Sequence, residues 1–216
     1  MEEQFTKPKT AAGAIIYWTL AFSLAYAIIR YHIAGDVPWK DFPFFILNKS
    51  IAMSAFILLT FNFVFGPLKN LGIAVSPRLL KSRRLVGIMG FIQALIHVFM
   101  SFMLFKPEVY SKFFDPNGSI SLIGGLSMLV GILAFVILWA YNISFNANFR
   151  KDKDLLEFIQ SRNTLLIGML LAGLHLVFMG YSGWMKPGGW GGMPPISLVS
   201  FAFFAVGFVI NLLGRK

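Results

Sequence analysis

The sequence predicts an all-α integral membrane protein, a six-transmembrane-helix bundle with both termini in the cytoplasm. The class follows from composition, since 57% of the 216 residues are hydrophobic and only 13% are charged. Soluble domains carry about 25% charged residues. The apolar residues also gather in stretches close to the length of about 20 residues that crosses a bilayer as a helix. An ordinary soluble domain is therefore excluded.

Six apolar stretches follow one another along the chain, separated by short polar breaks that contain Gly and Pro. We expect membrane spans near 12–31, 44–65, 85–105, 120–143, 164–183 and 196–213. The first stretch is followed by no small-residue cleavage site, so we interpret it as a retained span and not as a signal peptide. No polar segment is long enough for a soluble domain, so residues 1–216 are expected to form one transmembrane domain.

The basic residues indicate the orientation of these spans. Most of the 19 Lys and Arg residues fall at the N-terminus, in the second and fourth loops and in the C-terminal tail. Cytoplasmic loops are the ones enriched in Lys and Arg, so these segments are predicted to be cytoplasmic. The net charge of +10 is then a topology signal and not a nucleic-acid-binding surface, because the basic residues are divided among membrane-flanking loops.

Two of the three histidines lie inside spans and at matching depth. His97 lies as many residues past Arg84 in the third span as His175 lies past Arg162 in the fifth. Both are therefore expected about 20 Å from the cytoplasmic ends of their helices, slightly beyond the middle of the bilayer. Ionisable residues at this depth are generally functional. The third histidine, His32, ends the first span, where we interpret it as a solvated interfacial side chain.

Small residues accompany both intramembrane histidines. Gly90 precedes His97, and Gly168 precedes His175, by two turns on the same helix face. Helices in direct contact lie about 8–10 Å apart, so a flat macrocycle between two helices needs small side chains around its ligands. We interpret His97 and His175 as the two axial ligands of one haem, with both glycines beside it. A structural histidine pair or a haem-free proton relay in a transporter stays open.

The residue composition disfavours other kinds of metal site. The chain has no cysteine, which excludes thiolate metal sites and iron–sulfur clusters built on Cys. Zinc is disfavoured because a tetrahedral site needs more ligands than two histidines, and no carboxylate lies within the spans.

Basic residues near the span ends are candidate partners of haem propionates. Arg84 and Arg162 would serve if the propionates face the cytoplasm, although lipid headgroups are the alternative partners of such residues. If the propionates face outward, the candidates are Lys106, Lys112 and Lys186. The segment 148–162 alternates charged and apolar residues and is expected to form an amphipathic helix on the inner surface.

Two sequence motifs carry a family resemblance. The run Arg83-Arg84-Leu85-Val86-Gly87 leads into Ala94-Leu95-Ile96-His97, and Leu174-His175 stands in the fifth span. Over 61–184 the chain resembles the ferric-reductase-like transmembrane domain family, and within it the haem-binding membrane subunits of bacterial methionine sulfoxide reductase systems. The resemblance implies a bacterial inner-membrane location and one haem b. The chain lacks a second histidine pair, so a second haem would need ligands other than histidine.

The predicted function is that of a membrane b-type cytochrome. It would pass single electrons through one bis-histidine haem, between a quinol or cytoplasmic donor and an outer-side acceptor. Since the chain carries no flavin or nicotinamide domain of its own, we expect an electron-transfer subunit of an oxidoreductase, working with a partner redox protein or in a larger membrane complex. The alternatives are the haem-free transporter and a structural subunit of such a complex. No nucleic acid is expected as a partner, whereas quinone is a candidate second cofactor.

Overall fold

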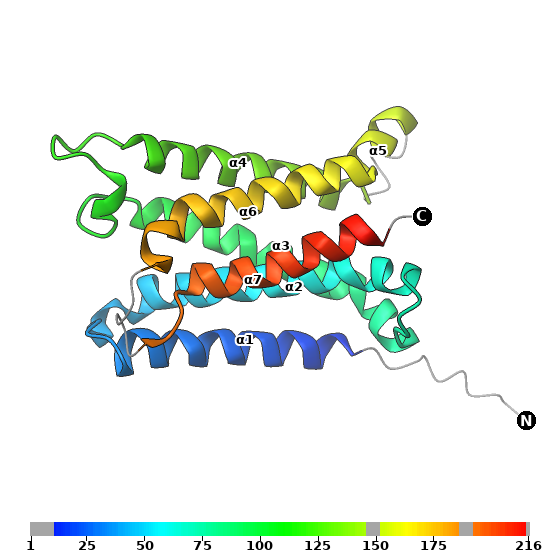
Figure 1. The fold of residues 1–216 in the computed structure, drawn as a ribbon, viewed down its shortest axis with the longest axis horizontal. Coiled ribbons are helices and arrows are strands. Elements are labelled where there is room, and N and C mark those ends of the chain that lie inside the picture. Colours follow the sequence, from blue (N-terminus) through cyan, green and yellow to red (C-terminus); the bar gives the residue numbers. More distant parts are fainter. Residues whose placement is uncertain (1–10, 146–151, 186–191, 215–216) are drawn as a thin grey trace, which may run out of the picture.

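The computed structural model describes residues 11–145, 152–185 and 192–214, and every regular element in these ranges is helical. Six long helices form a bundle (Figure 1): α1 (Ala12–Ile28), α2 (Leu47–Asn70), α3 (Pro77–Leu104), α4 (Leu122–Ile143), α6 (Arg162–Trp184) and α7 (Ile196–Leu213). The short α5 (Lys153–Gln160) precedes α6. The π-helical turns Ile29–Ile33 and Phe42–Ile46 continue α1 and lead into α2, and 3-10 turns occupy Trp39–Asp41 and Ser111–Phe113.

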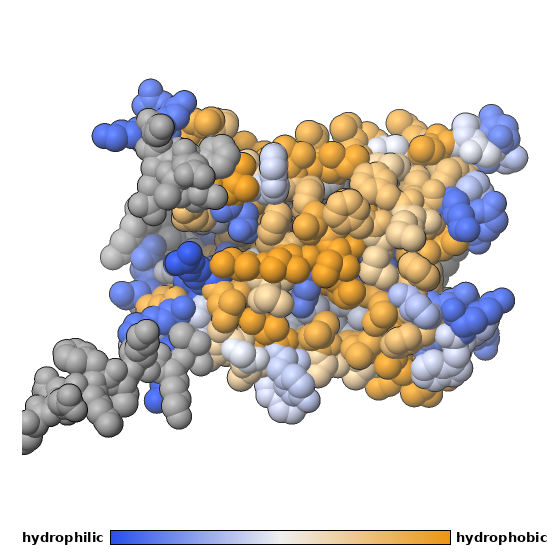
Figure 2. Space-filling view, turned by 180° about the vertical axis from the view of Figure 1, so that it is seen from behind, coloured by the Kyte–Doolittle hydropathy of each residue, from blue (hydrophilic) through white to orange (hydrophobic). Residues whose placement is uncertain are grey.

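All six long helices are long and apolar enough to cross a membrane. With their adjoining turns, the spans are 18 to 32 residues long. Figure 2 shows hydrophobic side chains over the middle of the bundle and hydrophilic side chains gathered at its two ends. This is the surface of an integral membrane protein, in which apolar side chains face lipid. The six expected spans are thereby confirmed as helices.

The third span is longer than the expected 85–105. Its helix starts at Pro77, because the Ser76 hydroxyl accepts a hydrogen bond from the Leu79 amide and proline is favourable in the first turn. The basic residues expected in the loop before this span therefore lie mostly on the first turns of α3. The second span also exceeds 44–65, reaching from Trp39 to Asn70.

The helices pack as two groups joined by α7. α2 packs against α1, α3 and α7, whereas α4 packs along α6, which also contacts α7. Figure 1 shows α4 and α6 together on one side of the bundle and α1 on the other. The buried side chains of Phe63 (α2), Leu176 (α6) and Phe204 (α7) pack together where the groups meet. In lipid such packing stabilises the bundle through van der Waals contact and not through the exclusion of water.

α1 begins and α7 ends at the same end of the bundle (Figure 1). We call this the terminal end and the opposite one the distal end. The expected amphipathic helix lies at the terminal end as α5, with Asp152 capping the Leu155 amide and with Leu155 and Phe158 exposed. Of the range 148–162 that was expected to form this helix, residues 148–151 lie outside the described residues.

Candidate functional site

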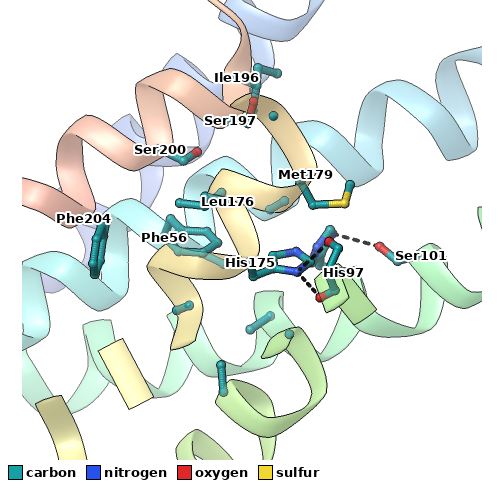
Figure 3. Close-up of a pocket in the computed structure, with 18 of the residues that line it drawn as sticks. Phe56, His97, Ser101, His175, Leu176, Met179, Ile196, Ser197, Ser200 and Phe204 are labelled. Atoms are coloured by element: carbon teal, nitrogen blue, oxygen red, sulfur yellow. Dashed lines mark hydrogen bonds between the residues drawn. The ribbon is translucent and has the colours of Figure 1, made fainter. Parts of the chain in front are cut away.

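A cavity of about 1090 Å³ lies between the two helix groups, lined by residues of α2, α3, α4, α6 and α7. Ligand sites in proteins generally have volumes of about 300–1,000 Å³. Both intramembrane histidines line this cavity, His97 from α3 and His175 from α6. Figure 3 shows the two imidazoles close to each other within it. The structure thus brings together the two residues that the sequence placed at one depth.

The His97 ring is held by a side chain of α2. Its Nδ1 lies 2.7 Å from Asn48 Oδ1. It also lies 3.3 Å from Ser101 Oγ (Figure 3). Asn48 Nδ2 in turn donates to Ser101 Oγ at 3.1 Å, which fixes which amide atom faces the histidine. A carbonyl oxygen only accepts, so Nδ1 of His97 carries the proton and Nε2 keeps a lone pair.

The His175 ring is held by the main chain of α4. Its Nδ1 lies 2.9 Å from the Ser127 carbonyl oxygen, which again makes Nδ1 the donor and leaves a lone pair on Nε2. The same helix approaches the ring closely at Gly131. A Cβ at that position would lie 2.7 Å from His175 Nδ1, so any larger residue would collide with the imidazole.

Both imidazoles are therefore oriented as metal ligands usually are. A ligating histidine donates its other ring N–H to a carbonyl or carboxylate, which fixes the tautomer and the ring orientation. Within the described residues, neither Nε2 makes a hydrogen bond, and no group of three or more His, Cys, Asp or Glu gathers to hold a metal ion by itself. A haem needs only two axial protein ligands, because the porphyrin supplies the other four nitrogens.

The cavity wall around the histidines is apolar and contains several small residues. The aromatic and aliphatic part includes Phe56, Leu59, Phe63, Phe135, Leu138 and Leu176. The small residues are Ala94, Gly131, Ala134, Gly168 and Ala172. Such a lining fits a flat, apolar ring held between helices. Gly168 is among these residues, as expected, and it also faces α4, where a Cβ would lie 2.9 Å from Ile137 Cγ2.

Gly90 does not line the cavity, which corrects the expectation that it makes room for haem. A Cβ on Gly90 would lie 3.0 Å from Leu59 Cγ and 3.2 Å from Leu58 Cβ, so this glycine allows the close approach of α2 and α3. It precedes His97 by two turns on the same face, but α2 covers that part of the face.

Arg84 and Arg162 also lie away from the cavity lining, contrary to the expected role beside haem propionates. Arg84 is exposed at the terminal end. Arg162 Nη2 donates to the Asn211 carbonyl at 2.6 Å and lies 3.4 Å from that of Leu212. These are carbonyls in the last turn of α7, where helices leave acceptors unsatisfied, so Arg162 caps that helix.

Among the described residues, three cationic side chains line the distal part of the cavity: Arg30, Lys49 and Lys112. Of the outward-facing candidates named from the sequence, Lys112 is confirmed as a lining residue, Lys106 is exposed and lines no part of the cavity, and Lys186 lies outside the described residues. Burial and the neighbouring Lys49 lower the pKa of Lys112 from 10.5 to about 8. No Asp or Glu is found among the described lining residues.

The cavity positions of Asn48, Lys49, Gly131 and Arg30 were not predicted from the sequence. The polar triplet Asn48-Lys49-Ser50 inside the second apolar stretch was a usable signal for the first two. Gly131 stands in a run of small residues at helical spacing in the fourth span, which also includes the cavity-lining Ser127.

His32 lines no part of the cavity. Its Nδ1 donates to the Val37 carbonyl at 2.8 Å, and its ring stacks on Trp39 with the ring centroids 4.0 Å apart. Its Nε2 is buried and has no hydrogen-bond partner, so the expectation of a solvated side chain was wrong. Because His32 has the same hydrogen-bond pattern but lies outside the cavity, it is a matched control for the two cavity histidines.

No protein-family model matches the sequence, and a search among curated proteins finds no match. The resemblance to the ferric-reductase-like transmembrane domain family therefore stays a prediction.

Proposed function

We propose that this chain is a membrane b-type cytochrome that holds one haem b between His97 and His175. The observation that carries the proposal is the pair of imidazoles on one cavity, each with its Nδ1 proton given to an oxygen and its Nε2 lone pair left available. His32 shows the same hydrogen-bond pattern, with Nδ1 donating to a carbonyl and Nε2 without a partner, but it lines no part of the cavity. The shared cavity is therefore what distinguishes His97 and His175.

The residues of the site orient the two histidine rings and surround the proposed haem with apolar side chains. The Asn48 amide and the Ser127 carbonyl hold the rings and make Nε2 a stronger donor of its lone pair to a metal. The apolar part of the wall would lower the local dielectric around a bound haem, which tunes its redox potential. When bound, haem iron supplies one-electron chemistry.

The position of the cavity suits electron transfer across the membrane. Its lining runs from Ile159 in α5 at the terminal end to Trp184 at the distal end of α6. We propose a quinol or cytoplasmic donor, an outer-side acceptor and cytoplasmic termini, with the chain working as a subunit of a larger redox system in a bacterial inner membrane. Quinone remains the candidate second cofactor.

The test is a reduced-minus-oxidised absorption spectrum of the purified chain, with haem quantified per chain. We expect b-type bands and one haem, lost in both His97→Ala and His175→Ala and kept in His32→Ala. Absence of b-type bands from the wild-type protein, or their retention in both cavity variants, would overturn the proposal. The first result would favour the haem-free transporter or the structural subunit.

A further inference from the structure

The distal part of the cavity concentrates positive charge from three separate elements. Arg30 lies in the π-helical turn after α1, Lys49 in α2, and Lys112 in the 3-10 turn Ser111–Phe113. All three line the cavity, and none of the described lining residues is acidic. Cations brought together in an apolar environment are costly unless an anion balances them.

Aromatic rings fix the position of Lys49. Its Nζ lies 5.3 Å from the ring centroid of Tyr31, 4.5 Å from that of Phe45 and 5.6 Å from that of Tyr110. The guanidinium carbon of Arg30 lies 5.5 Å from the same Tyr31 ring. These are cation–π distances, so the rings stabilise the two charges and hold them near each other.

Two of the three cations, Lys49 and Lys112, also lie next to or contact residues close to the histidines. Lys49 directly follows Asn48, the residue that accepts from His97. Lys112 Nζ donates to the carbonyl of Met179, which follows His175 by four residues on α6. Four residues of helix rise about 6 Å, so the bonded carbonyl lies about one turn to the distal side of the imidazole.

We infer that Arg30, Lys49 and Lys112 form a carboxylate-binding site at the distal mouth of the cavity, and that the two propionates of haem b occupy it. The second half of the inference rests on the proposed function. Charge-assisted hydrogen bonds from a guanidinium or an ammonium to a carboxylate are among the strongest in proteins. The porphyrin edge that carries the carboxylates then faces the distal end.

The terminal end offers no comparable site among the described residues. Arg84 is exposed there, and neither Arg84 nor Arg162 lines the cavity, whereas Arg30, Lys49 and Lys112 do. Because the cations that line the cavity lie at the distal end, we infer that the haem propionates face that end.

The test compares two probes that differ only in charge. Full-length protein depleted of haem in neutral detergent is titrated with iron protoporphyrin IX and with its uncharged dimethyl ester. We expect the wild type to bind the diacid more tightly than the ester. Lys49→Gln and Lys112→Gln should each weaken diacid binding by about tenfold, the value of one charge-assisted hydrogen bond, and leave ester binding unchanged.

Two further variants serve as controls. Lys106→Gln removes an exposed lysine of the distal end that does not line the cavity, and it should leave both affinities unchanged. Lys49→Arg keeps the charge and should retain the preference for the diacid. Undiminished ester binding in the glutamine variants shows that they have folded.

Equal affinity of the wild type for both probes, or an equal loss of both in the glutamine variants, would overturn the carboxylate site and leave the proposed function standing. If the wild type binds neither porphyrin, both proposals fail. A diacid preference that disappears when phosphatidylglycerol, but not phosphatidylcholine, is added would assign the cations to a lipid headgroup and overturn the propionate assignment.

Discussion

The two cavity histidines are held in different ways. His97 donates to a side chain, the Asn48 amide of α2, whereas His175 donates to the main-chain carbonyl of Ser127 in α4. A side-chain acceptor can be removed by one substitution, but a main-chain acceptor remains whatever residue replaces Ser127. The support of His97 is therefore open to direct mutation, while that of His175 can be disturbed only by displacing the ring or the helix.

The largest effect is expected from displacing the His175 ring. In Gly131→Val, the Cβ would stand 2.7 Å from Nδ1, and the imidazole has to leave its position. We expect haem per chain to fall to near the level of His175→Ala. The matched control is Gly125→Val on the same helix, where a Cβ meets nothing within 4 Å. Full haem content in Gly131→Val would show that the ring position is not needed.

A smaller effect is expected from removing the acceptor of His97. Asn48→Ala frees the ring to rotate and lowers the basicity of Nε2, so haem affinity should fall by about 10- to 100-fold and the redox potential should rise. Ser127→Ala keeps the carbonyl that binds His175 and loses only a hydroxyl 3.4 Å from Nδ1. Equal losses in the two variants, measured by haem titration, would contradict the difference between the two supports.

The preference for the diacid over the ester should change by about tenfold with pH. Because the pKa of Lys112 is lowered to about 8, its ammonium is charged below pH 8 and becomes neutral above it. Diacid affinity should therefore be full near pH 7 and fall by about tenfold towards pH 9, whereas ester affinity stays constant. Lys112→Gln should flatten the profile. A diacid affinity that rises over this range would contradict the assignment.

The smallest effect is expected at the terminal end. Arg162→Ala removes the cap of α7 and should lower the free energy of unfolding of the haem-free protein by about 1 kcal/mol, measured as a lower Tm in detergent. Haem affinity should not change, since Arg162 does not line the cavity. Arg84→Ala, which alters an exposed side chain, is the control. A specific loss of diacid affinity in Arg162→Ala would instead place the propionates at this end.

The six spans and the shared cavity of His97 and His175 could be predicted because hydropathy and helical rise act locally along the chain. The assignment of Gly90 was wrong because spacing gives the face of a helix but not which neighbour covers that face. Arg30 and Lys49 were missed as cavity residues for a related reason. Near a span end a basic residue indicates topology, and only the tertiary arrangement shows that these two point inward.

The segment before α7 has a consequence for how the protein is made. Tyr26 donates to the Pro194 carbonyl at 2.6 Å, and Arg30 donates to that of Met193, so the first span holds the chain that leads into the last. Residues of that last span, including Ser200 and Phe204, form part of the cavity wall. During synthesis the cavity is therefore complete only after α7 has entered the membrane and the segment before α7 has contacted the first span. Stable loading of the proposed haem would then have to follow translation through α7.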